Sequence, residues 1–134
     1  MNTELICLAT LSVFFFCAWV PSSIGKFRTL GGVYLLSNRD KKILQELPAW
    51  AARSERAYEN LKAFYPAYAA AILILCQLKF SDEATRMCAI VYVVGRIGHF
   101  ICYTYGFPKG RAIMWLTSMI ANVVLFVKIF AYFI

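Results

Sequence analysis

The residues with the clearest capacity for chemistry lie in one stretch, where Arg96 is followed by His99 three positions later and by Tyr103 seven positions later. Side chains at these spacings share one face of a helix. The neighbouring residues are largely apolar, and an ionisable group inside an apolar segment is costly unless it faces a cavity or a partner. A guanidinium binds a carboxylate through two parallel hydrogen bonds. The stripe therefore predicts one wall of a site for a small ligand that carries carboxylates.

A second stripe lies earlier in the chain, where Arg53, Arg56 and Asn60 have the same spacing. A further cation, Arg111, follows the first stripe after a short turn that contains proline and glycine. We expect the helix ends that carry these arginines to meet. The sequence thus predicts a pocket with several guanidinium groups.

Each residue also has a structural interpretation. Arg96 can pair with Glu55, with Glu59 or with a backbone carbonyl and so tie two helices together. His99 is the only histidine of the chain, so a metal ion would lack partners, and a hydrogen-bonded packing role is the alternative. Tyr103 is also typical of the aromatic belt at a membrane surface. The coincidence of the two stripes favours a site over these separate roles.

The elements that must position the stripes are indicated by composition. Of the 134 residues, 61% are hydrophobic and 16% are charged, whereas a soluble domain has roughly 45–50% and about 25%. This excess excludes a freely diffusing aqueous enzyme. The net charge is +7, but the basic residues do not form a stripe along a polar face. No nucleic-acid partner is therefore expected. The five cysteines lie in apolar runs without paired spacing, and neither a disulfide framework nor a metal site is expected.

We therefore expect an all-α integral membrane protein, with a single domain over residues 1–134 and four antiparallel transmembrane helices. The spans are expected at about 5–24, 63–78, 87–107 and 112–134, and the first is long enough to cross a hydrocarbon core of about 30 Å. The second span continues a helix that begins near Ala49 and is kinked at Pro66. The connection at 25–48 carries turn signals at Gly31–Gly32 and at 38–40.

Basic residues predict the orientation of the bundle. Ten of them fall in or beside the first and third connections and three on the opposite side. Because cytoplasmic loops collect lysine and arginine, those two connections are expected in the cytoplasm and both termini outside. The alternative for the first span is a cleaved signal peptide, which the absence of a basic residue before it disfavours.

The two polar stretches resemble the signature segments of the MAPEG family, the membrane-associated proteins in eicosanoid and glutathione metabolism. The segments are RSERAYENLKAFYP at 53–66 and RIGHFICYTYGFPKGR at 96–111. They are similar to the family patterns R-A-x-x-N-x-x-E-x-x-P and R-x-x-[HY]-x-x-x-Y, the second with a later arginine. The Asn-Arg-Asp at 38–40 and the Leu-Pro at 47–48 resemble bacterial members. This resemblance implies a protein of the bacterial inner membrane.

The family resemblance implies a homotrimer that binds glutathione between neighbouring subunits, near the cytoplasmic side. Glutathione would be a co-substrate, and no metal is implied. The catalytic role falls to Arg111, which would lie by the thiol and favour the thiolate. Contacts with glutathione are assigned by position to Arg56, Asn60, Arg96, His99 and Tyr103.

One departure from the family pattern bears on activity. Ala63 stands where the family usually has a glutamate, so a carboxylate expected to assist glutathione binding is missing. Ala112 stands where some prostaglandin-synthase members have a serine, so that isomerase activity is not indicated. The expected function is a glutathione-dependent transferase or peroxidase that acts on a lipophilic electrophile.

Two other functions stay open at this point. One is a non-enzymatic membrane protein that retains the scaffold, which Ala63 favours. The other is a small multidrug transporter. Such a transporter needs a carboxylate within the membrane, whereas all seven acidic residues of this chain lie at or outside the ends of the expected spans.

Overall fold

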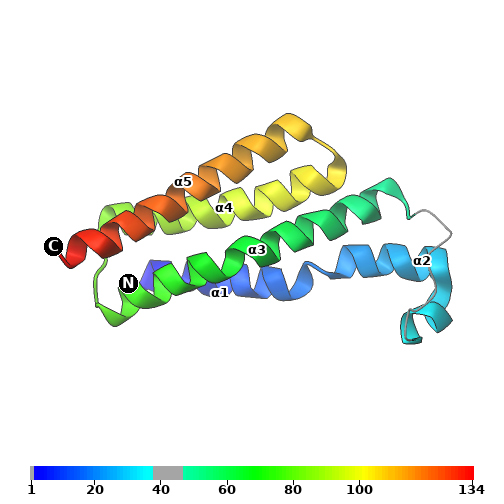
Figure 1. The fold of residues 1–134 in the computed structure, drawn as a ribbon, viewed down its shortest axis with the longest axis horizontal. Coiled ribbons are helices and arrows are strands. Elements are labelled where there is room, and N and C mark those ends of the chain that lie inside the picture. Colours follow the sequence, from blue (N-terminus) through cyan, green and yellow to red (C-terminus); the bar gives the residue numbers. More distant parts are fainter. Residues whose placement is uncertain (1, 38–46) are drawn as a thin grey trace.

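The computed structural model describes residues 2–37 and 47–134 and shows five helices in them. The helices are α1 (Asn2–Cys17), α2 (Val20–Leu36), α3 (Ala49–Gln77), α4 (Glu83–Tyr105) and α5 (Pro108–Tyr132). They form an elongated bundle in which α1 and α2 follow one another along one line (Figure 1). Both termini lie at one end of the bundle, and the α4–α5 connection lies at the other (Figure 1). The all-helical prediction is confirmed for the described residues.

Three stretches are long and apolar enough to cross a membrane, namely Thr3–Val33, Glu83–Tyr105 and Pro108–Tyr132. Their outward faces carry large apolar side chains, which would be unfavourable in water and suit lipid. On α5 this face is formed by Ile113, Leu116, Ile120, Val123, Val127 and Phe130, each more than half exposed. The helix α3 lies beside these stretches, with charged residues confined to its first half.

The first expected span and the connection after it need correction. The connection was expected over residues 25–48, but α2 extends to Leu36, with a kink at Gly31. Packing against α3 explains the extension: Gly25 lies so close to α3 that an added Cβ would come within 2.2 Å of the Cβ of Ala51. Lys26 also forms an ion pair with Glu55 of α3. These contacts stabilise residues that sequence alone assigned to a loop.

The line of α1 and α2 is interrupted at residues 18 and 19. Pro21 has no backbone N–H, so the hydrogen bond to the carbonyl of Cys17 cannot form. The hydroxyl of Ser22 donates to the carbonyl of Trp19 at 2.9 Å and satisfies one acceptor at the break. The expected turn at Gly31–Gly32 is present, because Gly31 has a φ of +79° within α2. The turn signal at 38–40 lies outside the described residues.

Helix α3 begins at Ala49, as expected, whereas α4 and α5 begin earlier than their expected spans, for local reasons. Asp82 and Thr85 form a capping box, so α4 begins at Glu83 rather than near 87. Pro108 occupies the first turn of α5, where a missing N–H costs nothing, so the short connection expected at 108–111 is helical. The expected kink at Pro66 does not divide α3, which is one helix of 29 residues.

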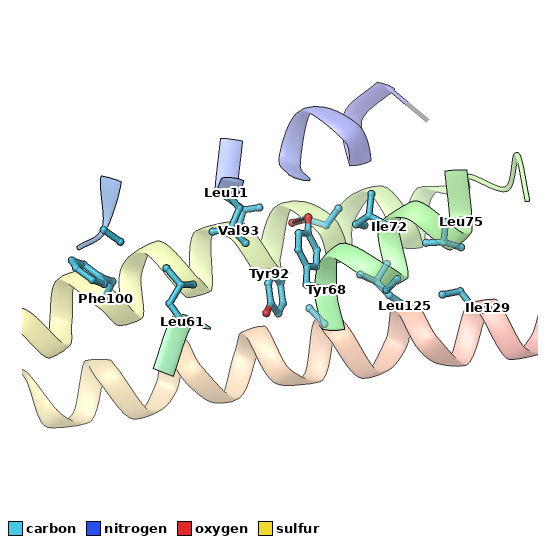
Figure 2. Close-up of a cluster of buried hydrophobic side chains, with 14 of the residues drawn as sticks. Leu11, Leu61, Tyr68, Ile72, Leu75, Tyr92, Val93, Phe100, Leu125 and Ile129 are labelled. Atoms are coloured by element: carbon cyan, nitrogen blue, oxygen red, sulfur yellow. Dashed lines mark hydrogen bonds between the residues drawn. The ribbon is translucent and has the colours of Figure 1, made fainter. Parts of the chain in front are cut away.

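The core lies between α1, α3, α4 and α5 (Figure 2). At its centre the rings of Tyr68 and Tyr92 stack face to face with centroids 4.0 Å apart, and both residues are fully buried. Helices α4 and α5 also approach closely, because an added Cβ on Gly95 would lie 2.9 Å from the Cβ of Ser118.

Candidate binding site at the basic end of the bundle

A cavity of about 280 Å³ lies where the start of α3, the end of α4 and the start of α5 meet. Three of its eight lining residues are arginines, and none is acidic. The elements that line it, the start of α3 and the α4–α5 connection, lie at the end of the bundle opposite the two termini (Figure 1). The cavity is lined by Arg53, Arg56, Cys102, Tyr103, Gly106, Phe107, Pro108 and Arg111.

Arg111 is held over the aromatic face of Tyr103, with its Cζ 4.7 Å from the ring centroid. This is a cation–π contact, which contributes about 0.5–2 kcal/mol depending on burial. The residue lies in the first turn of α5, where the backbone N–H groups give the helix end a partial positive charge. Both features make this wall of the cavity attractive to an anion.

Arg53 is fixed in the cavity wall by the end of α4. Its Nε donates to the carbonyl oxygen of Thr104 at 3.0 Å. Gly106 ends α4 with a φ of +82°, and an added Cβ there would come within 3.1 Å of the Arg53 Cζ. Glycine therefore permits both the left-handed turn and the close approach of the guanidinium.

Arg96 belongs to a buried group beside the cavity and does not line it. Its exposed fraction is 1%, and its Nη2 donates at 3.0 Å to both the backbone and the side-chain oxygen of Asn60. Among the described residues, its Nε and Nη1 have no hydrogen-bond partner. The structural interpretation in which Arg96 bonds to a backbone carbonyl is confirmed. The interpretation in which Arg96 pairs with Glu55 or Glu59 is wrong, because Glu55 pairs with Lys26 and Glu59 pairs with Lys62.

His99 connects this buried group to the cavity wall. Its Nδ1 lies 3.0 Å from the carbonyl oxygen of Arg111. Because a carbonyl can only accept, Nδ1 carries the proton. The imidazole also meets the ring of Tyr103 edge-on, at 5.6 Å between centroids. His99 thus contacts both members of the Arg111–Tyr103 pair without lining the cavity itself.

The structure divides the residues that the sequence assigned to one site. Arg56, Tyr103 and Arg111 line the cavity, whereas Asn60, Arg96 and His99 lie behind it. The site list from sequence lacked five of the eight cavity residues, and two of these, Arg53 and Cys102, have side chains that could take part in binding or chemistry. Arg53 had a signal, because it begins the stripe that includes Arg56. Cys102 had none, because it stands in an apolar run and only the fold turns it towards the arginines.

A second cavity, of about 380 Å³, lies near the same end of the bundle. It draws on α2, α3 and α4, and its walls are mainly apolar. The two cavities share no lining residue, but Thr104 of the apolar cavity accepts the hydrogen bond from Arg53 of the basic one. The apolar cavity is lined by Pro21, Trp50, Phe100, Ile101, Thr104 and Tyr105.

Comparison with known proteins agrees with the polar stripes and the helix order. The family model of the MAPEG family matches residues 6–131, which is nearly the whole chain. No curated protein matches the chain. The match includes α3 and α4, which carry the two stripes, and the start of α5 with Arg111. With its apolar helices and a family match of this extent, the chain is a membrane protein of the MAPEG family.

Proposed function

We propose that the protein is a glutathione-dependent transferase or peroxidase that acts on lipophilic electrophiles. The observation that carries the proposal is the group of three guanidiniums, from Arg53, Arg56 and Arg111, around one cavity. Glutathione has two carboxylates, and arginine binds carboxylates through paired hydrogen bonds. The cavity lies at the end of the bundle with most basic residues, where a water-soluble ligand could reach it.

Arg111 is the proposed catalytic residue. A free thiol has a pKa of about 8.5, so most of it is protonated at neutral pH. A guanidinium close to the sulfur stabilises the thiolate and raises the fraction of nucleophile. With an aryl halide, the thiolate sulfur forms a bond to carbon and the halide ion leaves. With a hydroperoxide, the thiolate attacks the terminal oxygen, the O–O bond breaks, and the alkoxide takes a proton from water; a second glutathione then displaces water from the sulfenic acid to give the disulfide. Tyr103 supports this role because its ring holds the guanidinium in place.

The other predicted residues divide into two roles under this proposal. Arg56, which is exposed, and Tyr103 contact glutathione directly in the cavity. Asn60, Arg96 and His99 position the site from behind, through the Arg96–Asn60 hydrogen bonds and the contact of His99 with the Arg111 carbonyl. The apolar cavity is the proposed site of the lipophilic substrate, which would enter from the bilayer.

The proposed arrangement in the membrane is a homotrimer in the bacterial inner membrane, with four spans in each chain and both termini outside. Support for the fourth span comes from α3, which at 29 residues measures about 44 Å. Its apolar second half lies against α4 and its charged first half reaches the basic end. The excess of basic residues at that end supports its placement in the cytoplasm.

Calorimetry tests the glutathione part directly. The purified protein in detergent is titrated with glutathione, and saturable binding at micromolar to millimolar concentration is expected. Turnover is then measured with a lipophilic aryl halide for the transferase and a lipid hydroperoxide for the peroxidase. No detectable binding at millimolar glutathione would overturn the proposal.

The second candidate is a non-enzymatic protein that retains the family scaffold. Ala63 favours it, because members of the family usually have a glutamate at this position. In this chain the position carries an alanine, on the exposed side of α3. This candidate predicts binding of a ligand in the basic cavity without turnover of either test substrate. Turnover that Arg111→Ala abolishes would exclude it.

A further inference from the structure

The last turn of α4 forms part of the wall of both cavities. Cys102 and Tyr103 line the basic cavity. Ile101, Thr104 and Tyr105 line the apolar cavity. Consecutive residues of a helix point in directions about 100° apart, so a single turn can present side chains on two sides. Any change in the position of this turn therefore alters both cavities.

The side chain of Arg53 holds this turn in place. Its Nε donates at 3.0 Å to the backbone carbonyl of Thr104. That carbonyl is one of the last four of α4, which have no partner within the helix. The carbonyls of Cys102 and Tyr103 accept from the backbone N–H of Gly106, whereas the Thr104 carbonyl accepts from another helix. Arg53 of α3 thus caps the C-terminal end of α4.

The guanidinium of Arg53 can cap α4 and bind a ligand at the same time. It carries five N–H donors in one rigid plane, and four of them belong to the two Nη atoms rather than to Nε. The side chain also lines the basic cavity, where a carboxylate can bind both Nη groups through parallel hydrogen bonds. A ligand need not displace the Thr104 carbonyl, so the two contacts support each other.

Helix α3 contributes to both cavities in the same way. Trp50 lines the apolar cavity and Arg53 the basic one, and residues three apart are neighbours on a helix surface. A ligand that contacts Trp50 and Thr104 would therefore hold the same two helix ends that Arg53 joins. Each cavity can thus be ordered by a ligand in the other.

We infer that Arg53 is a positioning residue that couples the two cavities, so that an anionic ligand in the basic cavity and an uncharged aromatic ligand in the apolar cavity each tighten the binding of the other. This inference rests on the proposed function, because it takes the two cavities as the sites of the two substrates. The physical reason is that each ligand orders the last turn of α4, so the second ligand meets a segment that is already ordered. The coupling must be reciprocal, with the same factor in both directions.

The first experiment uses two unreactive probes on the whole protein in detergent. S-methylglutathione keeps both carboxylates but has no free thiol, and nitrobenzene is an uncharged aromatic compound. Calorimetry gives the Kd of S-methylglutathione with and without nitrobenzene. Quenching of Trp50 fluorescence gives the Kd of nitrobenzene with and without S-methylglutathione, in a protein whose other tryptophans, Trp19 and Trp115, are replaced by phenylalanine.

Each probe is expected to bind roughly fivefold more tightly in the presence of the other, which is at the lower end of measured couplings between sites. Saturable binding of S-methylglutathione with a Kd that nitrobenzene does not change would overturn the inference and leave the proposed function intact. Failure of both S-methylglutathione and glutathione to bind at millimolar concentration would overturn the proposed function as well.

Two variants of the basic cavity assign the coupling to Arg53. Arg53→Lys keeps the charge, but a single ammonium group cannot hold a carbonyl and a carboxylate in one fixed plane. The coupling factor is expected to fall from roughly fivefold to less than twofold. Arg56→Lys is the matched control, because Arg56 lines the same cavity; it should weaken S-methylglutathione and retain the coupling. Full coupling in a folded Arg53→Lys protein would overturn the role of Arg53. The wild-type titrations decide whether the coupling exists even if this variant does not fold.

A second pair of variants tests whether nitrobenzene acts from the apolar cavity. Tyr105→Ala removes an aromatic wall of that cavity and is expected to weaken nitrobenzene severalfold, because a ring contact is lost. At a fixed, subsaturating concentration of nitrobenzene, the gain in S-methylglutathione affinity should shrink accordingly. Tyr132→Ala is the matched control, since Tyr132 is exposed at the far end of α5 and does not line the cavity. Equal effects of the two substitutions would overturn the placement of the aromatic ligand.

Discussion

The guanidinium of Arg111 lies on the ring of Tyr103, with 4.7 Å from Cζ to the ring centroid. The same arginine is also held through its backbone, because its carbonyl accepts a hydrogen bond from His99. The ring of Tyr103 in turn meets His99 edge-on. The three residues brace one another across α4 and α5, so the cation in the cavity wall has little freedom to move away from a ligand.

Removal of the Arg111 guanidinium should affect chemistry more than binding. Arg111→Ala is expected to lower kcat of glutathione conjugation by roughly a hundredfold, because the charge that stabilises the thiolate is lost. The KM for glutathione should change far less, since Arg53 and Arg56 remain. Lys109→Ala is the control, because Lys109 is exposed in the same turn of α5 and does not line the cavity. Equal losses in kcat and in affinity would contradict the thiolate role.

The ring of Tyr103 should matter more than its hydroxyl. Tyr103→Phe retains the aromatic face under Arg111 and is expected to keep conjugation rates close to those of the wild type. Tyr103→Leu removes a contact that contributes about 0.5–2 kcal/mol, so kcat should fall severalfold as the guanidinium loses its position. Steady-state kinetics of the two variants side by side provide the measurement. A Tyr103→Phe protein as slow as Tyr103→Leu would show that the hydroxyl takes part instead.

The link between Asn60 and Arg96 should contribute measurably to stability. Asn60→Ala removes the side-chain acceptor of a buried arginine, and the loss of a hydrogen bond to a charged group costs about 1.5–3 kcal/mol. The expected result is a lower midpoint of thermal unfolding in detergent. Lys62→Ala, on the same helix, breaks only the exposed ion pair with Glu59 and should cost less than about 1 kcal/mol. Similar midpoints for the two variants would speak against a structural role for the buried link.

The end of the bundle with the termini should lose stability in acid. The hydrogen bonds from the Lys128 ammonium and from the Thr85 backbone N–H hold the pKa of Asp82 below its usual value. Because the pKa of Asp82 is lowered in the folded state, its contribution to the free energy of unfolding is fully present above about pH 4, where the carboxyl group is also ionised in the unfolded chain. It is lost as the pH falls from there through the lowered pKa.

The Asp82→Asn variant tests this pH dependence. Thermal unfolding is followed between about pH 3 and pH 6, a range that spans the ordinary aspartate pKa. The variant keeps a side chain suited to capping but loses the charge that pairs with Lys128. Its midpoint should therefore fall less in acid than that of the wild type. Glu83→Gln, at an exposed neighbouring position, should retain the wild-type slope. Parallel curves for the wild type and Asp82→Asn would refute the assignment.

Cys102 offers a direct report on occupancy of the basic cavity. A protein in which the other four cysteines are replaced by serine or alanine should react with a water-soluble maleimide at Cys102. S-methylglutathione, which lacks a free thiol and so does not consume the reagent, should slow this reaction. The measurement is the rate of labelling by mass spectrometry, with Arg53→Gln as the variant in which protection should weaken. Labelling that is unaffected by saturating ligand would place the ligand elsewhere.

Much of this protein is determined by local sequence. The apolar runs require lipid as a solvent for the outer faces of the helices. Asp82 and Pro108 mark where α4 and α5 begin, because their side chains suit the first turn of a helix. The spacing of Arg53, Arg56 and Asn60 places them on one face whatever the rest of the chain does. These features depend only on residues within about two helical turns of one another along the chain.

Other features were decided only by the tertiary structure. The sequence could not show that Arg111 lines the cavity whereas Arg96 is buried behind it, because both are arginines in or near the polar stripes. It could not place Arg53 against the end of α4, extend α2 past residue 24, or turn Cys102 into the basic cavity. Each of these depends on which helix faces meet. That choice is made where backbones approach most closely, as at Gly25 beside Ala51 and Gly95 beside Ser118. Helical period specifies which residues share a face, but only packing specifies what that face meets.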